Sequence, residues 1–205
     1  MGALLSNFRN TVIVSVILAV LIVIGYAMHA PGGADGIFWQ AVFRWLHVFF
    51  GILWIGLLYY FNFVQIRMMP AVPAELKPAV SKYIAPEALF WFRWSALATW
   101  VMGIVLSISR GTFVEMISFG LANGYDKNTD AGFTFIGLGM WLATIMFLNV
   151  WGIIWPNQKK ALGIVEADAD TKAKAARLAM LGSRVNMLLS IPMLVCMTMN
   201  QTIFG

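Results

Sequence analysis

The sequence has few charges and one cysteine, and each scarcity narrows the class of protein. Only 11% of the 205 residues are charged, whereas an average soluble domain has about a quarter. The 14 basic residues do not cluster as they do in a nucleic-acid-binding protein. The single cysteine, Cys196, excludes an internal disulfide bond and a C-x-x-C-H motif, so we expect no covalent haem c. With 60% hydrophobic residues and a mean hydropathy of +0.79, the chain is better suited to a lipid bilayer than to water.

Long apolar runs organise the chain. Runs of about 20 apolar residues predict transmembrane helices, and they occur at about 11–28, 37–66, 86–108, 131–155 and 180–203. The first run is too long for the apolar core of a signal peptide, so we expect it to be retained. We expect Pro156 to end the fourth helix, and Asp170 or Thr171 to cap the helix that leads into the fifth. These signals predict an all-α, polytopic membrane bundle with a single domain over 1–205.

The distribution of lysine and arginine predicts the orientation. Ten basic residues would lie on one face of the membrane: Arg9, Arg67, Lys77, Lys82, Lys159, Lys160, Lys172, Lys174, Arg177 and Arg184. Only Arg110 and Lys127 would lie on the other face. Cytoplasmic loops carry the excess of lysine and arginine. We therefore expect a multi-pass protein of a bacterial inner (cytoplasmic) membrane, with a cytoplasmic N-terminus and a periplasmic C-terminus.

The second span carries a polar stripe at helical spacing, with Arg44, His47, Gly51 and Trp54 on one face. A neutral imidazole is a common axial ligand of haem iron, so His47 is a candidate metal ligand for a b-type haem. Gly51 would leave room for a flat macrocycle, and Arg44 would pair with a propionate. Alternatively, His47 hydrogen-bonds a neighbouring helix and Gly51 permits close helix packing.

A second group of polar residues is predicted at one depth, in the cytoplasmic half of the bundle. Its members are Asn62, Gln65, Arg93, Asn149, Arg184 and Asn186. They would form a substrate pocket for a planar or anionic ligand, with the two arginines as charge partners. The alternative is a hydrogen-bond network between helices, with Arg184 extending to the membrane interface. Glu87 is the carboxylate placed to pair with either arginine.

Several segments resemble the membrane domain of bacterial membrane-bound urate hydroxylases, over about 40–197. They are Arg44-Trp45-Leu46-His47, the stretch from Gly51 to Gln65, Phe92-Arg93-Trp94, Asn149-Val150-Trp151, Trp155-Pro156-Asn157-Gln158-Lys159-Lys160 and Ser183-Arg184-Val185-Asn186. The resemblance implies a multi-span membrane domain joined to a C-terminal cytochrome c domain, which oxidises urate and passes electrons onward. Because this sequence has no C-x-x-C-H motif, we expect it to lack the cytochrome c domain.

Two functions follow from these patterns. The first is a membrane-embedded redox protein that binds haem b through His47 and passes electrons to a separate partner, such as a cytochrome. The second is a non-catalytic accessory subunit that packs with other subunits into a larger respiratory or photosynthetic membrane complex. Neither pattern decides whether the chain is an enzyme. The sequence shows no inverted repeat of the kind found in many transporters, so a transporter is the weaker interpretation.

Overall fold

The computed structural model describes residues 2–122 and 124–204, apart from the side chains of residues 3 and 127–129. The described part is helical and contains no strand, as expected. Its α-helices are α1 Gly2–Leu5, α2 Phe8–His29, α3 Gly36–Tyr59, α4 Ile66–Met68, α5 Lys77–Ala79, α6 Ala85–Ser109, α7 Phe113–Ile117, α8 Lys127–Asn149, α9 Trp155–Ala161 and α10 Ala169–Phe204. Three π-helical segments, η1 Tyr60–Gln65, η3 Val80–Ile84 and η4 Val150–Ile154, and the 3-10 turn η2 Met69–Ala71 connect them.

Five helical stretches are long and apolar enough to cross a membrane, so the predicted number of spans is confirmed. They are Phe8–His29, Gly36–Ala71, Lys77–Ser109, Asp130–Ala161 and Ala169–Phe204. The predicted end at Pro156 is wrong. Pro156 lies in the first turn of α9, directly after η4, where a missing backbone N–H is tolerated. The helix therefore continues to Ala161, and α10 likewise continues through Pro192.

Side-chain caps set where several helices begin. The Asn7 side chain accepts a hydrogen bond from Asn10 N at the start of α2, and Asp35 accepts one from Phe38 N at the start of α3. At α10 the capping residue is Asp168, which accepts from Thr171 N at 2.8 Å and from the Thr171 hydroxyl at 2.7 Å. The predicted cap at Asp170 or Thr171 is therefore wrong, because the helix already begins at Ala169. These two hydrogen bonds from Thr171, the backbone one first, lower the pKa of the exposed Asp168 carboxyl.

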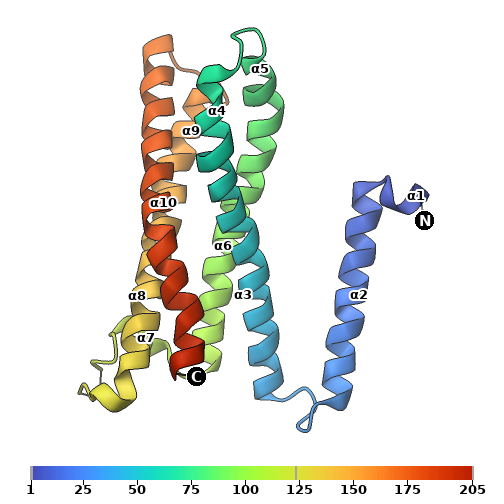
Figure 1. Cartoon of the computed structure of the whole chain (residues 1–205), viewed down its shortest axis with the longest axis vertical. Helices are drawn as coiled ribbons and strands as arrows, with labels where there is room; N and C mark the ends of the chain where they lie inside the picture. Colours follow the sequence, from blue (N-terminus) through green and yellow to red (C-terminus); the bar gives the residue numbers. More distant parts are fainter. Residues whose placement is uncertain (1, 123, 205) are drawn as a thin grey trace.

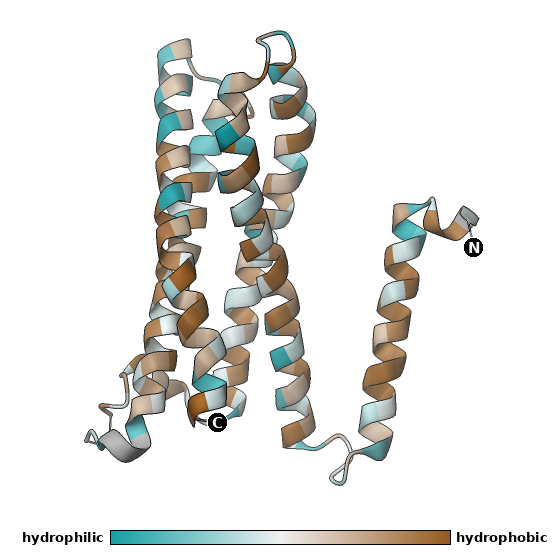
Figure 2. Cartoon of the chain, in the orientation of Figure 1, coloured by the Kyte–Doolittle hydropathy of each residue, from teal (hydrophilic) through white to brown (hydrophobic). Residues whose placement is uncertain are grey.

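Four of the spans form one bundle, and the first stands beside it. Figure 1 shows α3, α6, the α8–α9 helix and α10 packed together, while α2 is joined to α3 only by a loop. No residue of α2 is buried in the bundle. In a bilayer such a helix contacts lipid or another protein. Figure 2 shows that hydrophobic residues dominate the middle of every span.

Successive spans alternate in direction. α2 begins towards the end of the molecule where α5 and α9 lie, and α10 ends beside α7 at the opposite end (Figure 1). Which of these ends is cytoplasmic stays a prediction. The side chain of Lys127, one of the two basic residues assigned to the periplasmic face, lies outside the described residues.

The tightly packed core lies in the half of the bundle near α9. Its fully buried side chains include Trp54 and Leu58 of α3, Phe92 of α6, and Met146 of α8. α3 packs mainly on α6, and α8 packs mainly on α10. The two helix pairs meet in this core. Towards α7 a cavity lies between them.

Candidate functional site

His47 is fixed by a backbone contact across the α3–α6 interface. Its Nδ1 lies 2.9 Å from the carbonyl oxygen of Thr99. A carbonyl oxygen only accepts, so Nδ1 carries the proton and donates it. Nε2 then has a lone pair, and the hydrogen bond found for His47 among the described residues is the one made by Nδ1. A histidine that ligates a metal commonly donates its other N–H to a carbonyl in this way.

Gly103 of α6 provides the space that this arrangement needs. A Cβ atom at this position would lie 2.9 Å from Cε1 of His47 and 3.1 Å from its Nδ1. The Cε1–Nδ1 edge of the imidazole therefore lies close to the bare backbone of α6. A Cβ atom at Gly51 would meet only the Thr99 methyl group, at 3.7 Å, which is an ordinary contact. Both roles considered for Gly51, room for a macrocycle and close helix packing, stay predictions.

A cavity of about 690 Å³ lies next to His47, between α3, α6, α8 and α10. This volume is within the range of ligand sites, about 300–1,000 Å³. The four residues of the predicted cofactor group, Arg44, His47, Gly51 and Trp54, all line it. The structure thus brings these four residues to one cavity. The indole Nε1 of Trp54 is buried there without a hydrogen-bond partner among the described residues.

Two arginines give the cavity a positive charge. Arg44 of α3 and Arg110, at the end of α6, both line it, and none of the described lining residues is acidic. With the side-chain amide of Gln201 turned so that its oxygen faces Arg44, this oxygen accepts hydrogen bonds from both Nη1 and Nη2 of the guanidinium. The distance to Nη2 is 3.1 Å. A cation inside a membrane is costly without a partner, at about 3 kcal/mol on insertion scales. The cavity is therefore suited to an apolar ligand with an acidic group.

Arg110 and Gly103 were not identified from the sequence as site residues. Arg110 was used only in the count of basic residues that predicts the membrane orientation. A basic residue on the membrane face that has few of them is nevertheless a signal for a local role. Gly103 gave no signal, because its importance depends on which α3 side chain faces it. Three methionines, Met140, Met193 and Met197, also line the cavity. The described residues contain no group of three or more metal-binding His, Cys, Asp and Glu side chains.

The predicted second group divides into two parts. Three buried amides connect the helices at the depth of the core. Asn149 Nδ2 donates to Asn186 Oδ1 at 2.7 Å and to Gly182 O at 2.8 Å. Asn186 Nδ2 donates to Met146 O at 3.1 Å. Asn62 Nδ2 donates to Ser183 Oγ and to Leu58 O, both at 2.9 Å.

These contacts form a hydrogen-bond network between helices, which is the alternative stated from the sequence for this group. Asn186 and Asn62 are almost completely buried, with 0% and 2% of their surface exposed. Gln65 lies nearby on η1, with its amide oxygen buried and unpaired among the described residues. That any of these amides also binds a substrate stays a prediction.

The two arginines do not join the amides. Arg184 is exposed on the outer side of α10. The Arg93 guanidinium stacks on the Trp155 ring, 3.7 Å from its centroid, and Arg93 Nη1 donates to Leu89 O at 3.2 Å. The predicted pairing with Glu87 is wrong, because that carboxylate accepts from the indole N–H of Trp91 at 2.9 Å. Helix rotation places Arg93 towards α9 and away from the centre of the bundle.

A protein-family model matches the C-terminal part of the chain. The model of the family described as urate oxidase N-terminal matches residues 110–204, which include α7, α8, α9 and α10. No curated protein and no solved structure matches the chain. The match contains three of the segments that carried the resemblance in the sequence, which are Asn149-Val150-Trp151, Trp155-Pro156-Asn157-Gln158-Lys159-Lys160 and Ser183-Arg184-Val185-Asn186. Over residues 110–204 the chain matches the urate oxidase N-terminal family, and the predicted resemblance to that membrane-domain family is confirmed there.

Proposed function

We propose that this chain is a membrane-embedded redox protein that binds haem b in the His47 cavity and passes electrons to a separate partner. The observation that carries the proposal is the state of His47. Its Nδ1–H is held by the Thr99 carbonyl, and its unprotonated Nε2 belongs to a residue that lines a cavity of about 690 Å³. A fixed tautomer with an unprotonated nitrogen is what a haem ligand requires.

The surrounding residues fit the other parts of a haem. Arg44 and Arg110 would meet the propionate carboxylates, since arginine pairs well with carboxylates and no acidic side chain competes among the described lining residues. Apolar side chains such as Ile104, Ile136 and Leu194 would contact the macrocycle. Gly103 would keep the imidazole in its orientation. When bound, the haem iron would supply one-electron chemistry, and the positive charges of Arg44 and Arg110 would influence its potential.

A difference spectrum tests the proposal. Purified wild-type protein, reduced minus oxidised, should show a Soret band and the α-band of a b-type haem. His47→Ala should lose this signal, and His47→Gly should regain it when imidazole is added. His29→Ala is the matched control, because His29 is the other histidine and lies at the exposed end of α2. No haem in wild-type protein supplied with haem, or an unchanged spectrum in His47→Ala, would refute the assignment.

The first helix favours a second candidate function, that of an accessory subunit. α2 is apolar along its length, and none of its residues is buried in the bundle. In a larger respiratory or photosynthetic complex, this helix would pack against another subunit. Native electrophoresis of mildly solubilised membranes distinguishes the possibilities. Migration as a small free species, with or without α2, would exclude the accessory role.

A further inference from the structure

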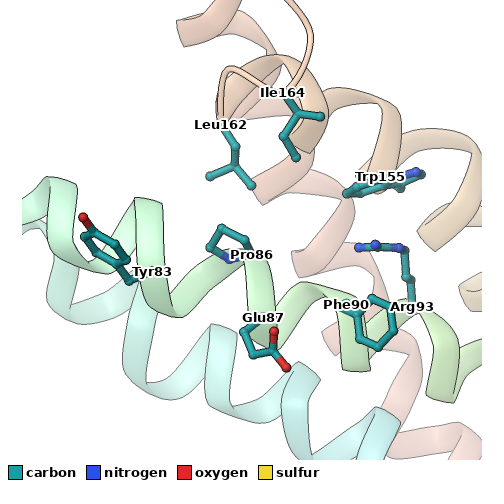
Figure 3. Close-up of a pocket in the computed structure, with 8 residues that line it drawn as sticks. All are labelled: Tyr83, Pro86, Glu87, Phe90, Arg93, Trp155, Leu162 and Ile164. Carbon is teal, nitrogen blue, oxygen red and sulfur yellow. The ribbon is translucent and has the colours of Figure 1, made fainter.

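A second pocket, of about 330 Å³, opens on the outer side of the bundle at the end opposite the His47 cavity. It lies between the start of α6 and α9 with the loop that follows α9 (Figure 3). Its lining residues are Tyr83, Pro86, Glu87, Phe90, Arg93, Trp155, Leu162 and Ile164. We call it the Arg93 pocket. The proposed haem does not involve any of these residues.

The Arg93 guanidinium is the charged centre of this pocket. One of its faces stacks on Trp155, and its carbon lies 5.5 Å from the centroid of the Phe90 ring. Its hydrogen bond to Leu89 O uses one of five N–H donors. Arg93 has no ion pair among the described residues, since Glu87 is bonded to Trp91 and points away from the guanidinium in Figure 3. The remaining donors are available to an anion.

A second cation lies beside the pocket, and the walls of the pocket are apolar. Lys159 does not line the pocket, but its Nζ lies 5.7 Å from the centroid of the Trp155 ring, so two positive groups contact one indole. Pro86, Phe90, Leu162 and Ile164 provide the walls. A ligand that satisfies both features has an anionic head and an apolar body.

The position in the fold selects the class of ligand. The pocket lies towards the ends of two candidate membrane spans, Lys77–Ser109 and Asp130–Ala161, where we expect the membrane interface. Trp91 and Trp94 follow on the outer side of α6 and are 47% and 46% exposed, so acyl chains would lie against them. Basic pockets between transmembrane helices at this level bind anionic lipid head groups. A free anion would use the charge of the pocket but not this apolar surface.

We propose that the Arg93 pocket binds the phosphate of an anionic phospholipid of the adjoining leaflet, with Arg93 as its main hydrogen-bond donor. Stacking on Trp155 holds the planar guanidinium in one orientation, and Lys159 adds positive charge beside the pocket. The bound lipid would join the start of α6 to α9.

Native mass spectrometry of the detergent-solubilised protein tests this proposal. Wild-type protein titrated with phosphatidylglycerol should retain one tightly bound lipid, and phosphatidylcholine should bind far less. Arg93→Gln should weaken phosphatidylglycerol binding about tenfold, equivalent to about 1.4 kcal/mol. Arg67→Gln is the control, since Arg67 is an exposed arginine on α4 at the same end of the molecule and lies outside the pocket. If Arg93→Gln does not fold, Lys159→Gln should still reduce binding measurably.

Any of the following three outcomes would overturn the proposal. Equal retention of phosphatidylglycerol by wild type and Arg93→Gln, or by wild type and Lys159→Gln, would show that the pocket does not hold the head group. Equal binding of phosphatidylcholine would remove the requirement for an anionic lipid. Displacement of the lipid by millimolar inorganic phosphate would indicate a free-anion site. The haem spectrum should be unchanged in Arg93→Gln, so failure here is distinguishable from failure of the haem assignment.

Discussion

Replacing Asn186 by alanine should destabilise the bundle more than any exposed amide replacement. Asn186 is completely buried, and it links α10 to α8 through two hydrogen bonds, from Asn149 Nδ2 at 2.7 Å and to Met146 O at 3.1 Å. Hydrogen bonds between membrane helices contribute about 0.6 kcal/mol each. A cavity of about a methyl group or more costs roughly 1 kcal/mol. Together these terms predict a loss of about 2 kcal/mol in the free energy of unfolding.

The measurement is unfolding in mixed micelles, followed by circular dichroism or steric trapping. Asn157→Ala is the matched control, because Asn157 donates only to Ile153 O of its own helical stretch, at 2.8 Å. Such a local change should alter stability by less than about 0.5 kcal/mol. The double variant of Asn149 and Asn186 should show a coupling energy of at least about 0.5 kcal/mol. If Asn186→Ala and Asn157→Ala are equally stable, the amide network does not hold α8 against α10.

Three further changes test other parts of the structure. Gly103→Ala should displace the His47 ring and weaken or shift the proposed haem absorption. Gly25→Ala on α2, where an added Cβ meets nothing within 4 Å, should leave the absorption intact, and equal spectra would contradict the packing of His47 on α6. Arg44→Gln should raise the dissociation constant of haem about tenfold, the effect of about 1.4 kcal/mol, measured by haem titration. The lowered pKa of Asp168 means that its capping contribution is present above the unfolded pKa of about 3.9 and is lost as pH falls through the lower folded pKa. The protection factor of the first amides of α10, which corrects for the intrinsic pH dependence of exchange, should therefore fall in acid for wild type and change little for Asp168→Asn.

Local sequence was sufficient for the elements of the fold. Hydropathy predicted five spans because transfer of apolar side chains into lipid is a sum over residues and needs no knowledge of their neighbours. The helical spacing of Arg44, His47, Gly51 and Trp54 was sufficient to place them on one face, because the α-helical period is the same in every protein. The resemblance to the urate oxidase N-terminal family was also readable, and it is confirmed over residues 110–204.

Side-chain partners were decided only when the helices packed. Arg93 and Asn149 were expected at one depth, and depth follows from the rise per residue, but the direction of each side chain follows from the rotation of its helix. The π-helical segments η3 and η4 insert a wider turn ahead of Arg93 and Trp155, and each inserted residue turns the following side chains by about 100°. Hydropathy carries no trace of such an insertion. For the same reason, only the packing of α3 on α6 shows that His47 donates to the Thr99 carbonyl and that Gly103 leaves room for its ring.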